Sequence, residues 1–407
     1  MDAILTAAAR ALDAGDVLEA LKRVALRNDA PALALRGVAL ARLGKFERAR
    51  DLLHEAARAF GTRAPGQRAR CLLADAEIAL ASRDLRGLDA ALAMANRTLS
   101  AQGDVVNAAH ATCLAARNLL LRGRLDEAEI ALTSLADQRR PATLETAVQL
   151  TWADLHLRKL NSRAAKRAIE QAGRAAKRAG IASLSSEFEA MRARLVEPIA
   201  RAIRNGIQQE LGTAELEALL QKKRFLVVDA RELVLRTTQI RVPLKRRPIL
   251  FALARALADA WPAAATRGEL ILRAFAVTRV NESHRARLRV ELTRLRRALR
   301  AVATITATPQ GFQLSTLGAS EVVVLARLAD DDHANLLALL SDGEAWSSSA
   351  LALALGVSQR SVQRALLALE QAGKVRAIGR ARAQRWLPAP SAGFAPSLLL
   401  PSALQLA

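Results

Sequence analysis

The sequence predicts a mainly α protein, in which an N-terminal array of helical hairpins precedes two smaller α+β domains. Three observations carry this prediction. Similar segments recur at intervals of 36 to 41 residues in the first half of the chain. The pattern changes from helical to alternating after Lys222, and a second helix-turn-helix pattern follows near the C-terminus. Fixed periods of this size are typical of stacked helical hairpins, and alternation is typical of strands.

The composition is that of a chain with enough apolar residues for several folded domains. Of its 407 residues, 51% are hydrophobic, and no apolar run is long enough to span a bilayer. An acid at Asp2 and a base at Arg10 do not fit a secretion signal. We therefore expect a cytoplasmic protein without a membrane partner. Two cysteines, Cys71 and Cys113, exclude a disulfide scaffold and a cysteine-rich zinc site.

The positive charge is concentrated in two segments. The net charge is +22, and residues 221–320 alone carry 20 basic and 6 acidic side chains. Residues 345–388 carry seven basic side chains and a single acid, Glu370, whereas residues 321–344 are acidic. A uniform preference for arginine would not produce this distribution. Two compact basic segments predict two heads that bind a polyanion.

Residues 1–220 are predicted to form a helical repeat domain. Four segments superpose, ending at Ala49, Ala90, Ala128 and Ala164, and a shorter copy ends at Ala20. Each is expected to form a helix, a tight turn and a second helix that starts at the alanine. The segments resemble the tetratricopeptide repeat, which implies an α-α solenoid. Such a solenoid serves as an oligomerising spacer or as a groove for a peptide or small effector, and the sequence leaves both roles open.

Residues 221–317 are predicted to form the first α+β domain. The expected strands are 225–230, 233–236 and 240–244. The expected helices begin near Pro248, after Thr266 as N-cap and at Ser283, the last reaching Arg300. A hairpin at 305–314 closes the domain. This order, together with the motifs Leu295-Arg-Arg-Ala-Leu299 and Gly311-Phe312, resembles the winged helix-turn-helix of OmpR/PhoB-like response regulators.

The resemblance implies that the third helix of this domain is a recognition helix. Leu288, Leu292, Leu295 and Leu299 form one stripe for burial. The DNA-binding candidates on the other faces are Arg287, Arg289, Thr293, Arg294, Arg296 and Arg297. Two features depart from the family: Glu291 falls among the positions expected to face the groove, and the wing at 306–310 carries no base. A protein-binding winged helix with an arginine-rich surface stays an alternative.

Residues 318–388 are predicted to form a second winged helix-turn-helix. A first helix is expected at 333–340 and the link before it includes a strand or helix near 322–328. Gly356 should supply the turn, Val357 should fill the angle between the helices, and Ser358 should cap the next helix. The segment resembles the winged helices of bacterial transcription regulators. Its DNA-binding candidates are Gln359, Arg360, Gln363 and Arg364 on the helix and Arg380 and Arg382 in the wing.

The sequence offers no constellation for catalysis. The histidines lie far apart, and nucleotide loops and nucleophile motifs are missing. We therefore expect no enzyme, no cofactor and no metal. Cys71 and Cys113 are interpreted as small core residues, with a redox pair as the alternative. The Pro/Ser-punctuated tail at 389–407 is either frayed or a docking peptide.

Together these features predict a bacterial transcription regulator that binds double-stranded DNA sequence-specifically through two winged helices. The expected partners are double-stranded DNA, RNA polymerase as a further candidate, a peptide or protein ligand of the repeat domain, and a second copy of the chain in a homo-oligomer. The alternative is a repeat-based adaptor whose winged helices contact proteins instead of DNA.

Overall fold

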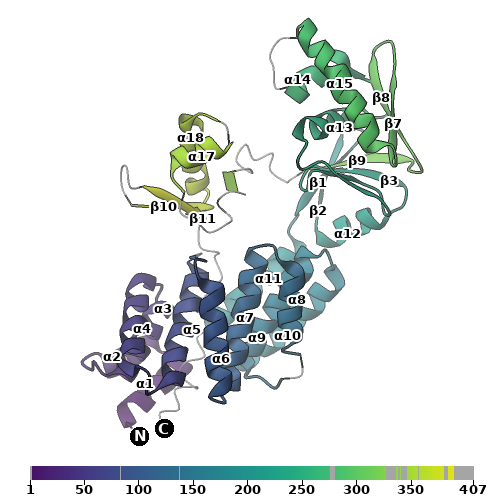
Figure 1. The fold of residues 1–407 in the computed structure, drawn as a ribbon. Coiled ribbons are helices and arrows are strands. Elements are labelled where there is room, and N and C mark those ends of the chain that lie inside the picture. The colour runs from purple at the N-terminus through teal and green to yellow at the C-terminus, as the bar shows by residue number, and fades with distance from the viewer. Residues whose placement is uncertain are drawn as a thin grey trace. The chain divides into compact units, whose positions relative to one another are not determined.

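The computed structural model describes residues 2–82, 84–136, 138–275, 280–326, 336–337, 340, 346–355, 357–379 and 384–388. The protein is mainly helical, as predicted (Figure 1). The chain divides into two compact units. The first holds residues 1–159, 163–194 and 332–407, and the second holds residues 160–162 and 195–331. The predicted tail at 389–407 lies outside the described residues.

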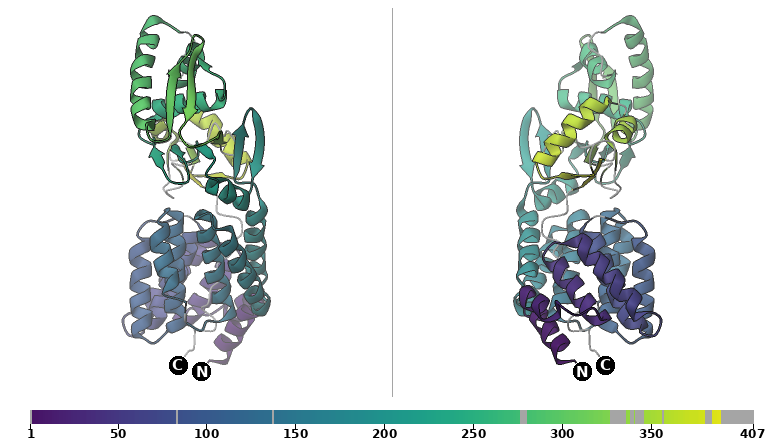
Figure 2. Two further views of the ribbon diagram at one scale, coloured as in Figure 1. Left: turned by 90° about the vertical axis from the view of Figure 1, so that its right-hand side faces the viewer. Right: turned by 90° about the vertical axis from the view of Figure 1, so that its left-hand side faces the viewer.

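The N-terminal part of the first unit is a succession of helices. They are α1 (Ala3–Asp13), α2 (Val17–Val24), α3 (Ala30–Arg42), α4 (Phe46–Phe60), α5 (Pro65–Ala81), α6 (Leu88–Ala101), α7 (Val105–Leu121), α8 (Leu125–Thr133), α9 (Ala142–Arg158), α10 (Ser162–Ala179) and α11 (Ala182–Val196). From α1 to α9 each helix packs on the next one in the chain, and Figure 2 shows the helices side by side. Buried alanines and leucines fill the space between them.

The recurring segments fall on the turns between odd-numbered and even-numbered helices, as their pattern predicted. The second helix begins three residues before the marker alanine at Phe46 and Leu125, and both Ala49 and Ala128 are fully buried. The segment ending at Ala90 differs, because Ala90 is exposed and α6 buries Leu88 and Leu92 instead. The helix–turn–helix order was therefore predicted correctly, but not the starting residue of the second helix.

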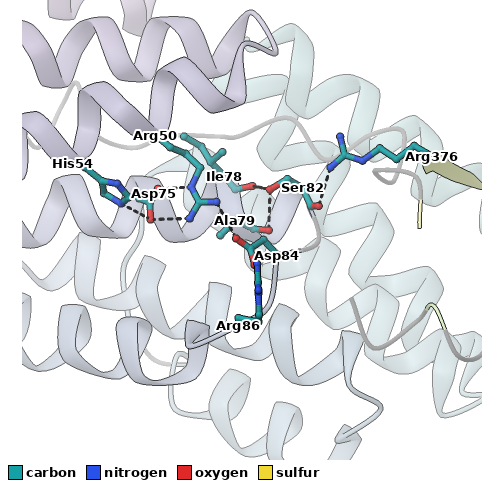
Figure 3. Close-up of polar contacts among 9 residues, drawn as sticks. All are labelled: Arg50, His54, Asp75, Ile78, Ala79, Ser82, Asp84, Arg86 and Arg376. Atoms are coloured by element: carbon teal, nitrogen blue, oxygen red, sulfur yellow. Dashed lines mark hydrogen bonds and ion pairs between the residues drawn. The ribbon is translucent and has the colours of Figure 1, made fainter. Parts of the chain in front are cut away.

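Ion pairs join neighbouring hairpins of this part. Arg50 on α4 donates from Nε to Asp75 Oδ1 on α5 at 2.7 Å and from Nη1 to Asp84 Oδ2 at 3.0 Å (Figure 3). His54 Nε2 lies 3.1 Å from the other oxygen of Asp75. These contacts hold α4 against α5 and the turn that precedes α6.

The helical sequence predicted up to residue 220 is wrong between residues 200 and 211. These residues form the hairpin of β1 (Ala200–Arg204) and β2 (Ile207–Leu211), followed by the short helix α12 (Thr213–Gln221). Asn205 and Gly206 form the turn with φ of 51° and 77°. Asn-Gly is the dipeptide that favours such a tight hairpin, because both residues adopt positive φ at low cost. The hairpin belongs to the second unit, in the segment Leu195–Asp331.

The second unit contains a sheet of six strands in the order β2-β1-β9-β3-β4-β5. The remaining strands are β3 (Phe225–Asp229), β4 (Val234–Arg236), β5 (Arg241–Pro243) and β9 (Glu321–Ala326). The three strands predicted between 225 and 244 are therefore present. The segment near 322–328, expected as part of a link, supplies β9, which pairs in parallel with β3 and antiparallel with β1. It is a central strand of the sheet.

Three helices and a smaller sheet follow, close to where they were predicted. They are α13 (Pro248–Ala260), α14 (Arg267–Phe275) and α15 (Glu282–Leu299), with β6 (Ala265–Thr266), β7 (Ala303–Ala307) and β8 (Gly311–Thr316) paired in the order β6-β8-β7. Thr266 accepts from the Glu269 amide and donates to its carboxylate, so it starts α14 as expected. One apolar core joins the three helices to both sheets.

The described C-terminal residues form α17 (Ser348–Leu355), α18 (Gln359–Gln371), β10 (Val375–Ile378) and β11 (Arg385–Pro388). Ser358 caps α18 by accepting from the Ser361 amide, and Gly373 follows the helix with φ of 66°, as predicted. Val357, expected to fill the angle between the helices, is 49% exposed. Leu351, Val362 and Leu366 form the core instead. Of the helix predicted at 333–340, only residues 336, 337 and 340 are described, and Gly356 lies outside the described residues.

Gly311 in the Gly-Phe motif is required by a close approach of two strands. A Cβ on this residue would lie 1.9 Å from the carbonyl oxygen of Ala265 on β6. The first residue of β8 therefore has room for hydrogen only, and this explains why glycine precedes the aromatic residue.

We predict that Gly311→Ala destabilises the second unit by about 3 kcal/mol or more, because the backbone of β6 cannot yield without losing its pairing with β8. Gly318→Ala is the control, since nothing lies within 4 Å of its Cβ position and only its φ of 78° is unfavourable. The control should cost about 1 kcal/mol. Urea unfolding followed by circular dichroism measures both, and equal losses would contradict the assignment.

Candidate nucleic-acid interface

Helix α15 has one buried face and one arginine-rich face. Leu288, Leu292, Leu295 and Leu299 are each at most 3% exposed, so the predicted leucine stripe is confirmed. The six candidate residues on this helix are all exposed, namely Arg287, Arg289, Thr293, Arg294, Arg296 and Arg297. The helix is held by apolar contacts, and its guanidinium groups point away from the core. A helix of this kind is suited to contact a polyanion.

The arginines of α15 are not equivalent, because the structure gives several of them partners within the protein. Arg287 lies over the Phe275 ring, with 4.7 Å between Cζ and the ring centroid. Arg296 donates from Nε to the carbonyl oxygen of Ile305 at 2.9 Å. Thr293 donates its hydroxyl to the Arg289 carbonyl, one turn back on the same helix. Arg296 therefore braces α15 against β7 and is a weaker candidate for DNA contact than its exposure suggests.

Phe312 lies at the hairpin that was predicted to be a wing and contacts basic side chains from outside that hairpin. Two guanidinium groups lie over its ring, with Arg267 Cζ at 5.5 Å and Arg296 Cζ at 5.8 Å from the centroid. Arg267 also donates to the carbonyl oxygens of Thr308 and Pro309 in the turn of the wing. The positive charge at the β7–β8 hairpin is therefore supplied by Arg267 on α14 and Arg296 on α15, which Phe312 holds through cation–π contacts.

The expectation that Glu291 faces the groove is wrong. Glu291 is 8% exposed and accepts from Arg294 Nη1 at 2.9 Å. The reason is its place on the helix, one residue before Leu292 and on the flank that turns towards α13. Glu291 is therefore turned away from the exposed arginine face and is paired with Arg294.

The predicted residues on α18 are exposed as expected. Gln359, Arg360, Gln363 and Arg364 lie on its first two turns, whereas Val362 and Leu366 are buried. Gln359 donates from its side-chain amide to Ser348 Oγ on α17 at 3.2 Å. Arg380 and Arg382 of the predicted second wing lie outside the described residues.

Three further residues lie beside the α15 candidates and were not predicted from the sequence. Arg246 and Arg247 lie next to the start of α13 and line one cavity together with Arg294 and Arg297. The signal was the basic run Lys245-Arg246-Arg247 directly before Pro248. Val290 on α15 is 51% exposed among the arginines. An exposed apolar side chain there is suited to contact a thymine methyl group.

The helical part of the first unit contains a cavity of about 470 Å³. It lies among α8, α9 and α10 and is lined in part by Trp152 and His156, whose rings stack with centroids 5.3 Å apart. A cavity of this size is sufficient for a small effector. Elsewhere in the same part, Arg117 contacts Glu187 at 2.9 Å and Thr151 at 2.9 Å.

Comparison with known proteins assigns no relative to this chain: no family model, no curated protein and no solved structure matches it. Within the described residues, none of the helices is long and apolar enough to cross a membrane. In the same part of the chain, no three histidine, cysteine, aspartate or glutamate side chains are grouped so that they could hold a metal ion.

We predict that both cysteines are unreactive in the folded protein. Cys71 on α5 and Cys113 on α7 are at most 1% exposed, and burial raises the pKa of the Cys71 thiol to about 12 and also raises that of Cys113. Since the thiolate is the reactive form, Ellman's reagent at pH 8 should detect no thiol in the native protein and two in denaturant. Rapid native labelling of either cysteine would support the redox alternative.

Proposed function

We propose that the protein is a sequence-specific, double-stranded DNA-binding transcription regulator. The observation that supports this most strongly is the exposed arginine face of α15, opposite a stripe of four buried leucines. A helix that is fixed by its apolar face and exposed on its basic face can enter the major groove, where arginine pairs with guanine edges and with phosphates.

The order of elements supports a winged helix in each basic segment. In the second unit β3–β5, α13, α14, α15 and the hairpin β7–β8 follow one another as the resemblance to OmpR/PhoB-like domains implies. In the C-terminal segment α17, the capped α18 and the hairpin β10–β11 have the order of the second winged helix. The proposal assigns DNA contact to the exposed residues of α15 and α18.

The helical hairpins of residues 1–199 complete the proposal as a repeat solenoid of the tetratricopeptide kind. Its two open roles are oligomerisation and the binding of an effector, for which the cavity beside Trp152 is the candidate. The two basic segments, which follow the repeat domain in the sequence, would then bind DNA. RNA polymerase is the further candidate partner. A cytoplasmic location follows from the same proposal.

We predict that Arg360→Ala combined with Arg364→Ala weakens specific binding by about 1–3 kcal/mol for each arginine that contacts a base, and relaxes selectivity at one or two base pairs. The arginines lie on the exposed first turns of a capped helix, so the substitution should leave folding intact. Arg48→Ala combined with Arg58→Ala, on the exposed face of α4, is the control for lost charge.

The measurement is a competition shift assay against a duplex library selected from genomic fragments. Unchanged affinity and base preference in the α18 variant would remove this helix from the interface. Absence of duplex binding by the unsubstituted protein would instead favour the adaptor, whose winged helices contact proteins.

We further predict that Arg289→Gln combined with Arg294→Gln reduces the slope of log affinity against log salt by about one to two units, since each lost phosphate contact contributes roughly 0.9. Arg48→Gln combined with Arg58→Gln should leave the slope unchanged. An equal slope for all three proteins would show that α15 does not touch the duplex.

A further inference from the structure

The second unit contains a cavity of about 690 Å³ beside the arginine-rich face of α15. It lies between the start of α13 and one flank of α15. Arg246, Arg247, Arg294 and Arg297 line it together with Glu291, and the rest of its wall is apolar, from the first turn of α13 and from Ala298. All of these residues belong to one compact unit.

The charges around this arginine cavity do not balance. Four guanidinium groups meet one carboxylate, and Glu291 already accepts from Arg294 at 2.9 Å. Arg246, Arg247 and Arg297 are exposed, and no carboxylate among the described residues pairs with any of them. Three like charges that converge on one space repel each other. An anion between them removes that repulsion and accepts their hydrogen bonds.

The backbone at the start of α13 adds to the positive potential of the arginines. Arg247 is the N-cap of α13, and its side chain makes no capping hydrogen bond. Pro248 at the first helical position has no amide hydrogen, and the following residues, Ile249 and Leu250, line the cavity. The positive end of the helix dipole thus faces the same space as the guanidinium groups.

We propose that the arginine cavity is a phosphate-binding site with Arg246, Arg247 and Arg297 as its ligands. The planar fork of arginine matches two phosphate oxygens at once, which favours phosphate over a monovalent anion such as chloride. The phosphate comes from one of two sources. It is either a backbone phosphate of the duplex, in which case the inference rests on the proposed function, or a phosphate group of a small phosphorylated molecule.

The test uses the full chain, the variant Arg246→Gln/Arg247→Gln and the control Lys222→Gln/Lys223→Gln, which removes the same charge from the same unit outside this cavity. Calorimetric titration with inorganic pyrophosphate, without DNA, forms the first arm. The second arm is the salt dependence of duplex binding. Arg297→Gln serves as an independent variant on the other wall, and thermal unfolding verifies that each protein is folded.

Pyrophosphate binding that weakens about tenfold or more in the cavity variants but not in the control supports the site and assigns it to a small phosphorylated molecule. A salt slope that falls by about two units in the double variant alone, at roughly 0.9 per phosphate, assigns the site to the duplex. No difference between cavity variants and control in either arm overturns the proposal. If the unsubstituted protein binds no duplex, the proposed function fails. The pyrophosphate titration then still tests whether the cavity binds phosphate.

Discussion

The arrangement of the second unit depends on the pairing of β9. Val322 and Val324 on one face of this strand belong to the core beneath α13 and α15, whereas Val323 and Leu325 on the other face belong to the core beneath α12. Parallel pairing with β3 needs a long crossover, and here the crossover contains every helix and strand from β4 to β8. Helix α15 lies within the chain that connects β3 to β9. The pairing of these two strands therefore also determines where the arginine face of α15 lies in the second unit.

Elements with local signals could be predicted from the sequence, and elements defined by distant partners could not. The leucine stripe, the caps at Thr266 and Ser358 and the glycine turns act within a few residues, and the structure has them where they were expected. The role of β9 depends on β1 and β3, more than 90 residues earlier in the chain. The hairpin at Asn205-Gly206 had a local signal, but its polar strands, with four exposed residues in β2, gave little alternation to support it.

The candidate interface could be predicted as a surface but not residue by residue. The spacing of leucines on α15 determines which side chains are exposed, and all six candidates there are. The spacing of residues along the helix does not show which of the exposed arginines already contacts another group of the protein. The acceptor of Arg296 is a backbone carbonyl on β7, and Glu291 is buried because the start of α13 approaches that flank. Both facts arise from tertiary packing, as does the convergence of Arg246 and Arg247 on Arg294 and Arg297.

The packing of the leucine stripe also explains how α15 can keep arginines such as Arg289 and Arg297 without an acidic partner. Burying each leucine of the stripe contributes about 1.5–3 kcal/mol, whereas an exposed ion pair contributes about 1 kcal/mol at most. Stability therefore does not require carboxylates opposite Arg289 or Arg297. Two arginines, Arg267 and Arg296, contact Phe312 and backbone carbonyls at the β7–β8 hairpin, and these contacts need no acidic partner. Arg289 and Arg297 can therefore stay exposed without an acidic partner, because the fold is stabilised without them, and this is what the proposed contact with an external anion requires.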